Sequence, residues 1–153
     1  SRIHSTDLRN IFQNKVISLL QSRERNDLVF LTQDYKAPIL KQGNLDNKKT
    51  LLVFIESDCG HCVLQMAELI EQYPKIKEKG YQVISISADL DEETYQKASN
   101  SYPWKYKYCD FEGVGGDDFV NYRVQGTPTF FVIDDNSIIE GIYARVVDID
   151  FLK

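Results

Sequence analysis

The sequence is poor in cysteine and contains no long hydrophobic run. Its three cysteines among 153 residues are too few for a disulfide-rich secreted scaffold, and their odd number leaves at least one thiol without a partner. No apolar run reaches the roughly 18 residues that a membrane-spanning helix requires, so we predict no transmembrane segment. Lysine and arginine form no dense block and the net charge is -5, so no nucleic-acid partner is expected.

The size of the chain predicts a single globular domain. With 42% hydrophobic residues it can bury enough surface to fold without disulfide bonds, and we expect a monomer. The first residue is Ser1 rather than Met, and no charged and apolar leader with a cleavage site opens the sequence. We interpret this as a mature or trimmed form, from which a signal peptide, a lipid anchor or an upstream domain could have been removed.

Two elements are predicted ahead of Cys59 and Cys62. Apolar residues at helical spacing predict an amphipathic helix over residues 5–24. The stretch "NDLVFLTQDYKAPIL" holds two short apolar runs, which predict a hairpin whose second strand lies at a sheet edge because it contains Pro38. We therefore divide the chain into a helical extension over residues 1–27 and a domain over residues 28–153.

Strands and helices alternate from residue 50 onward. "TLLVFI" (50–55) is typical of a strand buried on both faces, and apolar residues after Cys59 follow helical spacing until Pro74. Further elements are expected at 81–88 (strand), 91–100 (helix, begun by Asp89 or Asp91), 117–124 (short helix), 129–134 and 138–144 (antiparallel strands) and, in "VVDIDFLK", the first turn of another helix. This order predicts an α/β fold with a central mixed β-sheet flanked by helices.

The stretch "ESDCGHCVLQM" places Cys59 and Cys62 three positions apart, and three interpretations compete for it. A zinc site needs four ligands, but outside the pair the chain offers only Cys109, His4 and His61. A structural disulfide between these positions would close a very small loop and constrain the unfolded chain little. Redox chemistry is therefore favoured, and no metal or organic cofactor is expected.

The position of the pair at a helix N-terminus favours redox chemistry. Unpaired backbone N–H groups and the helix dipole stabilise a thiolate there, which makes Cys59 the expected nucleophile and Cys62 the resolving thiol. Gly60 leaves the rim open for a partner disulfide. His61, when protonated, favours the thiolate and a more oxidising couple, although it could also be a plain exposed polar residue.

The strand, the Cys-x-x-Cys pair, the helix and the later "QGTPTFFVID" (125–134) together resemble the thioredoxin superfamily. The resemblance implies a thioredoxin-like fold in which Thr127 and a cis Pro128 face the cysteines and contact substrate. An N-terminal hairpin and a central insertion, "DEETYQKASNSYPWKYKYCD", are similar to the TlpA/ResA-like branch of bacterial envelope proteins. The Cys-Gly-His-Cys motif itself is similar to that of protein disulfide isomerases.

This resemblance implies a thiol:disulfide oxidoreductase that exchanges disulfides with protein substrates in the bacterial periplasm or cell envelope. Anchoring through a segment outside this sequence is compatible with that location. A reductase would need a membrane or protein electron donor. Two alternatives stay open: the oxidase or isomerase direction of the same chemistry, and a thioredoxin-like binding module without catalysis.

Several flanking residues depart from the family pattern. Val53 stands where thioredoxins hold a buried acid, Asp58 replaces the usual Trp before the first cysteine, and Gln65 replaces a frequent Glu. A carboxylate next to Cys59 would raise its pKa, against the effects of the helix and of His61. The direction of electron flow is therefore left undecided.

The segment before Cys109 is aromatic. Tyr102, Trp104, Tyr106 and Tyr108 alternate at period two, which predicts a strand with one packed face. We expect Cys109 to be a buried, unreactive thiol, with a second redox partner or a regulatory thiol as the alternatives.

Overall fold

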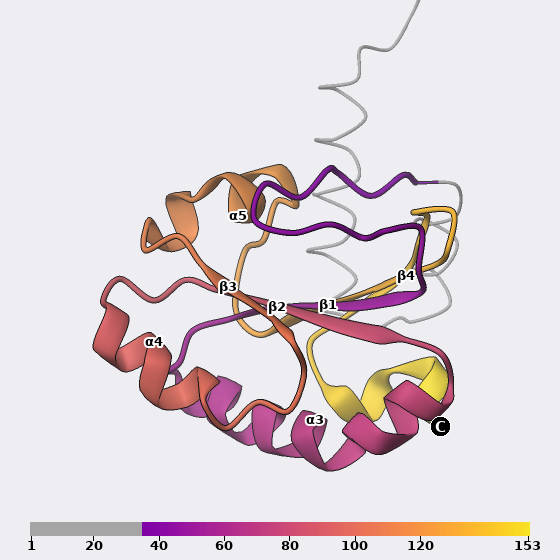
Figure 1. The fold of residues 1–153 in the computed structure, drawn as a ribbon, viewed down its shortest axis with the longest axis horizontal. Coiled ribbons are helices and arrows are strands. Elements are labelled where there is room, and N and C mark those ends of the chain that lie inside the picture. The colour runs from indigo at the N-terminus through magenta and orange to yellow at the C-terminus, as the bar shows by residue number, and fades with distance from the viewer. Residues whose placement is uncertain (1–34) are drawn as a thin grey trace, which may run out of the picture.

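A five-stranded sheet organises residues 35–153, the part of the chain that this computed structural model describes (Figure 1). The predicted helix at 5–24 and the first strand of the predicted hairpin lie outside the described residues. The strands are β1 (Thr50–Ile55), β2 (Gln82–Ser87), β3 (Tyr106–Cys109), β4 (Thr129–Ile133) and β5 (Ile139–Tyr143), in the spatial order β3-β2-β1-β4-β5.

The sheet is mixed, as predicted. The first three strands are parallel, whereas β4 is antiparallel to β1 and β5 is antiparallel to β4. The two closing strands form a hairpin, because Asp134 accepts hydrogen bonds from the backbone N–H groups of Asn136 and Ile138 at the turn. Because β1, β2 and β3 run in the same direction, their C-terminal ends lie at one edge of the sheet, where the connections that follow them meet.

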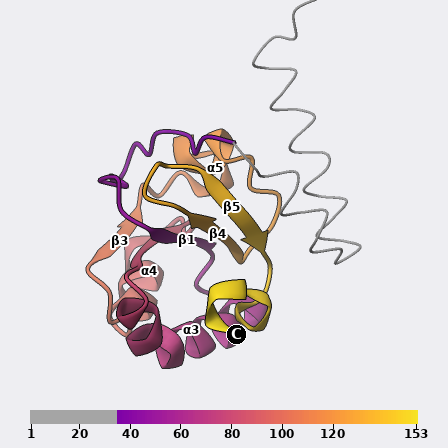
Figure 2. The same cartoon turned by 90° about the vertical axis from the view of Figure 1, so that its right-hand side faces the viewer.

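Helices cover both faces of the sheet (Figures 1 and 2). The helical segments are α3 (Gly60–Glu78), α4 (Glu92–Ser99), α5 (Asp117–Asn121) and the 3-10 turns η1 (Gly113–Gly115), η2 (Val146–Asp148) and η3 (Asp150–Leu152). α3, α4 and the C-terminal turns lie on one face, and α5 lies on the other together with residues 35–49.

Alternation along β1 divides the core into two layers. Leu52 and Phe54 point to the α5 side, and Leu51, Val53 and Ile55 point to the α3 side. All six residues of the strand are buried, so the prediction of a strand covered on both faces is confirmed. The strand thereby fixes the position of the cysteine pair that follows it.

The helix after the cysteines does not stop at Pro74, and this prediction was wrong. α3 continues for four more residues and buries Ile76 completely. Proline in a helix removes one hydrogen bond and costs about 3 kcal/mol, a cost that burial of the last turn against the sheet offsets in large part.

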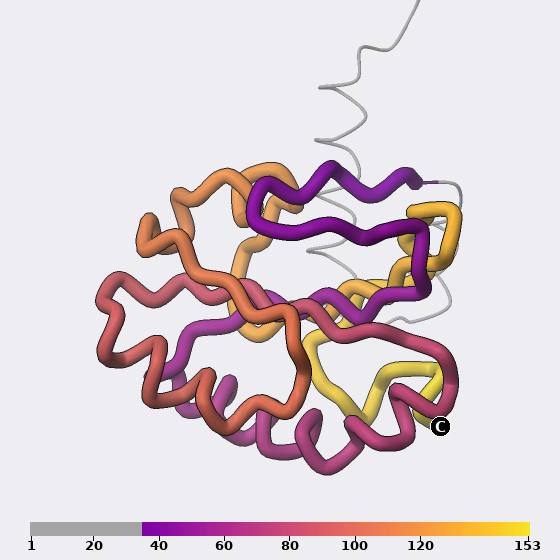
Figure 3. Tube along the Cα trace, in the orientation of Figure 1, coloured from indigo at the N-terminus to yellow at the C-terminus, as the bar shows by residue number. Residues whose placement is uncertain are grey.

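Residues 35–49 form an extended covering segment rather than an edge strand. Only Lys36 makes a bridge, to Ile138, and Pro38 donates no backbone hydrogen bond. The carboxylate of Asp118 instead accepts hydrogen bonds from the backbone N–H groups of Lys41, at 2.7 Å, and Gln42, at 3.1 Å. Figure 3 shows this segment running beside α5, so tertiary contacts hold it where no strand pairing does.

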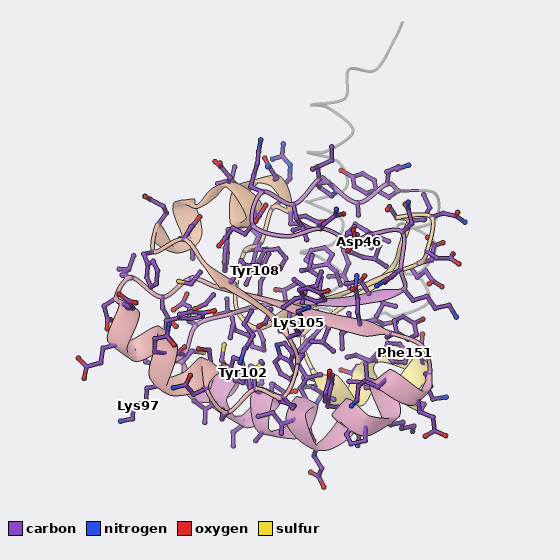
Figure 4. All side chains as sticks on the ribbon, in the orientation of Figure 1. Asp46, Lys97, Tyr102, Lys105, Tyr108 and Phe151 are labelled. Carbon is purple, nitrogen blue, oxygen red and sulfur yellow. The ribbon has the colours of Figure 1, made fainter. Side chains whose placement is uncertain are left out.

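Two further predictions need correction. The four alternating aromatic residues do not share one packed face: Tyr102 and Trp104 pack in the layer on the α3 side, whereas Tyr106 and Tyr108 pack on the other side. Figure 4 shows Tyr102 and Tyr108 on these opposite sides. The strand begins only at Tyr106, so period-two alternation does not extend across the preceding loop. The C-terminal "VVDIDFLK" forms two 3-10 turns instead of an α-helical turn.

Candidate active site

The connection from β1 to α3 presents the two cysteines. Cys59 is the N-cap residue of α3, with extended backbone angles of φ -80 and ψ 121, and Cys62 lies in the first turn. Cys59 is half-exposed and Cys62 is buried, with both thiols free. The placement at the helix N-terminus agrees with the sequence prediction.

The two thiols differ in acidity. The backbone N–H of Cys62 directed at the Cys59 sulfur lowers the pKa of Cys59, and the backbone N–H of His61 and the side chain of Thr127 lower it further. Burial raises the pKa of Cys62 to about 11. Within one helical turn, the exposed thiol is therefore the more readily ionised one and the buried thiol stays protonated.

Thr127 and Pro128 lie against the pair. The Thr127–Pro128 peptide bond is cis, as the resemblance implies. The side chain of Thr127 interacts with both thiols and lowers the pKa of each. Thr127 is half-exposed and Pro128 is buried directly before β4.

Gly60 and His61 lie on the exposed rim of the site. A Cβ atom placed on Gly60 would meet nothing within 4 Å, so the space beside this residue is open. The His61 side chain is exposed and its backbone N–H contributes to the stabilisation of the Cys59 thiolate.

The departures from the family pattern have definite places. Val53 is fully buried in the same layer as Cys62, so an aliphatic side chain occupies the position of the familiar buried acid. Asp58 is exposed. Gln65 accepts a hydrogen bond from the backbone N–H of Val146 at 2.8 Å and thereby ties α3 to the C-terminal turns.

Asp89 is a residue of the site that the sequence analysis missed. It was considered only as a helix cap, a role that Asp91 takes by accepting a hydrogen bond from the backbone N–H of Thr94 at 2.8 Å. The buried carboxylate of Asp89 accepts hydrogen bonds from the backbone N–H, at 2.9 Å, and the hydroxyl of Ser57. It therefore fixes the loop two residues before Cys59, and only its position directly after a buried strand could have indicated this.

Cys109 is separate from the pair. Cys109 ends β3, and β2 lies between β3 and β1. The strand that carries Cys109 is therefore about 10 Å, or two strand spacings, from the strand that leads to the pair. The Cys109 thiol donates to the backbone carbonyl of Asp89 at 3.3 Å, and burial raises its pKa. Cys109 is half-exposed, so the prediction that it is buried was wrong, because β3 lies at the edge of the sheet. Its raised pKa and its hydrogen bond support the prediction that the thiol is unreactive.

The site offers no preformed metal cluster. Within residues 35–153, no three or more His, Cys, Asp or Glu side chains are arranged to hold a metal ion.

Over the same residues, no helix is long and apolar enough to cross a membrane.

A mixed sheet with a dithiol at a helix N-terminus, faced by a cis-proline loop, defines a thioredoxin-like protein. The chain belongs to the AhpC/TSA family, whose model matches residues 29–142. It is 30% identical over 117 residues to the thiol-disulfide oxidoreductase ResA of Bacillus anthracis, covering 74% of this chain and 65% of ResA. It is 32% identical over 98 residues to mouse nucleoredoxin, covering 62% of this chain and 22% of nucleoredoxin.

Solved structures show the same fold. A thiol-disulfide oxidoreductase from Bacteroides fragilis superposes with a TM-score of 0.58 at 24% identity, over 67% of this chain and 75% of that one. The thioredoxin domain of a thiol-disulfide oxidoreductase from Bacteroides vulgatus gives a TM-score of 0.60 at 24% identity, over 71% and 76%. The predicted thioredoxin-like fold is thus confirmed.

The opposite pKa directions of the two thiols predict selective alkylation. In the reduced protein, iodoacetamide is expected to modify Cys59 first, with a rate that rises with pH through a midpoint below 9.0, because only the thiolate reacts. Cys62 should stay unmodified until the pH approaches its pKa of about 11. Peptide mass spectrometry across the pH range measures both midpoints, and faster alkylation of Cys62 or Cys109 than of Cys59 would contradict the assignment.

The buried carboxylate of Asp89 predicts a loss of stability on truncation. Asp89→Ala is expected to lower the free energy of unfolding by about 1–3 kcal/mol, because two hydrogen-bond donors of Ser57 lose their acceptor. Urea denaturation of the reduced protein measures it. Asp89→Asn, which keeps one acceptor oxygen, serves as the matched variant and should lose less; equal losses would count against the hydrogen-bond explanation.

Proposed function

We propose that this protein is a thiol:disulfide oxidoreductase that acts on protein substrates through a Cys59/Cys62 dithiol-disulfide couple. The observation that carries the proposal is the half-exposed Cys59 thiol, with its lowered pKa, one helical turn from a buried thiol with a pKa of about 11. The chain is 30% identical to ResA, a thiol-disulfide oxidoreductase, and spans 65% of its length. This similarity supports the same activity.

The exchange has two steps in the reducing direction. The Cys59 thiolate attacks one sulfur of a substrate disulfide, the substrate S–S bond breaks, and the released substrate thiolate takes up a proton. Cys62 then loses its proton and attacks the Cys59 sulfur, which forms the Cys59–Cys62 disulfide and releases the second substrate thiol. The substrate gains two electrons and the protein loses two, and the reverse sequence oxidises a substrate dithiol.

The surrounding residues have supporting roles in this proposal. The Thr127 side chain interacts with both thiols and favours their charged forms, and the loop at Pro128 provides the surface along which a substrate strand lies next to Cys59. Gly60 adds no side chain to the exposed rim beside Cys59, where a substrate would approach. His61 adds its backbone N–H to the stabilisation of the Cys59 thiolate, which makes the couple more oxidising.

We propose a location in the bacterial cell envelope or periplasm and a monomeric state, with a membrane or protein electron donor if the protein works as a reductase. The likeness to the ResA relatives supports this location. The division into an extension at 1–27 and a domain at 28–153 stays a prediction, because residues 1–34 lie outside those described.

An equilibrium redox titration tests the function and its direction. The protein is equilibrated with mixtures of reduced and oxidised glutathione, and its thiols are alkylated and counted by mass spectrometry, with Cys59→Ser as the control. A potential near -270 mV, as in thioredoxin, supports the reductase, and one near -180 mV supports an oxidase or isomerase. If the pair does not cycle at all, the oxidoreductase hypothesis is replaced by that of a binding module without catalysis. The aliphatic Val53, in place of a buried acid, favours this alternative.

A further inference from the structure

The edge of the sheet that carries the cysteine pair has a concentration of negative charge. The ends of the three parallel strands are aligned, with Ile55 paired to Ser87 and Ser87 paired to Cys109. The connections that follow them therefore meet at one edge of the sheet, on the left of Figure 1. Residues 56–59, 88–93 and 110–117 hold nine Asp and Glu and neither Lys nor Arg.

Most of these carboxylates are available to solvent. Asp89 is buried and bonded to Ser57, but Asp58, Glu92, Glu93 and Glu112 are exposed. The exposed Asp91 is held in its charged form, because the backbone N–H of Thr94 lowers its pKa. The face around Cys59 therefore repels anions and attracts cations within about 10 Å at ordinary salt concentrations.

Apolar side chains are exposed between these charges. The structure describes eight exposed large hydrophobic residues, and five of them lie in these connections or in the first two turns of α3: Val63, Leu64, Leu90, Phe111 and Val114. Leu90 is 73% exposed and Val114 is 61% exposed.

Contacts hold two of these loops together beside the cysteine loop. A Cβ atom on Gly113 would lie 3.0 Å from the Leu90 side chain, so the loop after β3 packs against the loop after β2. Phe111 contacts the ring of Tyr95 on α4 edge-on, at 5.9 Å between centroids. Asp89, next to Leu90, is bonded to Ser57 two residues before Cys59, which ties the loop of Leu90 to the cysteine loop.

We propose that the partner of this face is a positively charged polypeptide segment that carries an apolar side chain next to its cysteine or disulfide. Lysine and arginine side chains of the segment lie over the acidic connections, and its apolar side chain packs on Leu90 and Val114. The charges set the encounter rate and select the partner, and the apolar contact holds it while exchange proceeds. This inference rests on the proposed function, for which it names the substrate class.

Three synthetic peptides with a disulfide test the inference. They share one sequence with a leucine beside a cysteine and differ only in flanks of three lysines, three glutamines or three glutamates. Acid-quenched reaction of the reduced protein gives the rate constants. We expect the lysine peptide to react about tenfold faster than the glutamate peptide at low salt, and this ratio to fall toward one at high salt.

Matched triple variants assign the preference to this face. Glu92→Gln/Glu93→Gln/Glu112→Gln should reduce the lysine-to-glutamate ratio to about threefold. Glu68→Gln/Glu71→Gln/Glu78→Gln makes the same charge change at exposed positions of α3 and should keep the full ratio. Leu90→Ser/Val114→Ser should slow the reaction of all three peptides.

Different results separate this inference from the proposed function. Equal rates for the three peptides, or a ratio that the first triple variant leaves intact, overturn the inference while the oxidoreductase assignment stands. If the reduced protein reacts with none of the peptides, the proposed function itself fails and the inference fails with it.

Discussion

Cys59→Ser protein is expected to lose disulfide exchange completely, whereas Cys62→Ser protein accumulates a mixed disulfide with its substrate. The serine hydroxyl is not ionised near neutral pH and cannot replace the Cys59 thiolate as the attacking group. Without Cys62, the first step still occurs, but no second thiol lies within a helical turn to release the substrate. The half-exposed position of Cys59 and the buried position of Cys62 give the two variants these different outcomes.

Non-reducing electrophoresis and mass spectrometry of each variant after reaction with a peptide disulfide measure this difference. Cys109→Ser is the matched control, because it removes the third thiol of the chain and should leave exchange intact. Residual turnover by Cys59→Ser, or a trapped complex through Cys109, would show that the roles are assigned to the wrong thiols.

Phe54→Ala is expected to lower the free energy of unfolding by about 3–5 kcal/mol. Phe54 is fully buried in β1 and contacts three other aromatic rings, those of Phe119, Tyr122 and Phe131, at centroid distances of 4.9, 5.4 and 5.7 Å. Alanine would leave a cavity between the sheet and α5, because the surrounding side chains relax only in part.

Urea denaturation with a linear extrapolation measures the loss. Phe111→Ala removes the same side chain from an exposed position and should change stability by less than about 1 kcal/mol. A Phe54→Ala protein that unfolds at the same urea concentration as the unsubstituted chain would contradict the described packing of this layer.

The sequence by itself determined the features that depend on neighbouring residues. The strand at β1, the start of the helix after Cys59 and the antiparallel closing strands are all found where they were predicted. The same local reasoning placed Cys59 at a helix N-terminus, where backbone N–H groups lower its pKa. It identified Thr127 and Pro128 only through a resemblance, because no local rule connects residues so far apart.

The tertiary structure decided the features that depend on contacts distant in sequence. Asp89 reaches Ser57 across 32 positions, and Asp118 reaches Lys41 across 77, so neither carboxylate could be assigned from its own surroundings. α3 continues past Pro74 because Ile76 is buried against the core, and helix propensities carry no information about such a tertiary contact. The acidic face around Cys59 exists because three parallel strands end at one edge of the sheet, and only the pairing of those strands brings their loops together.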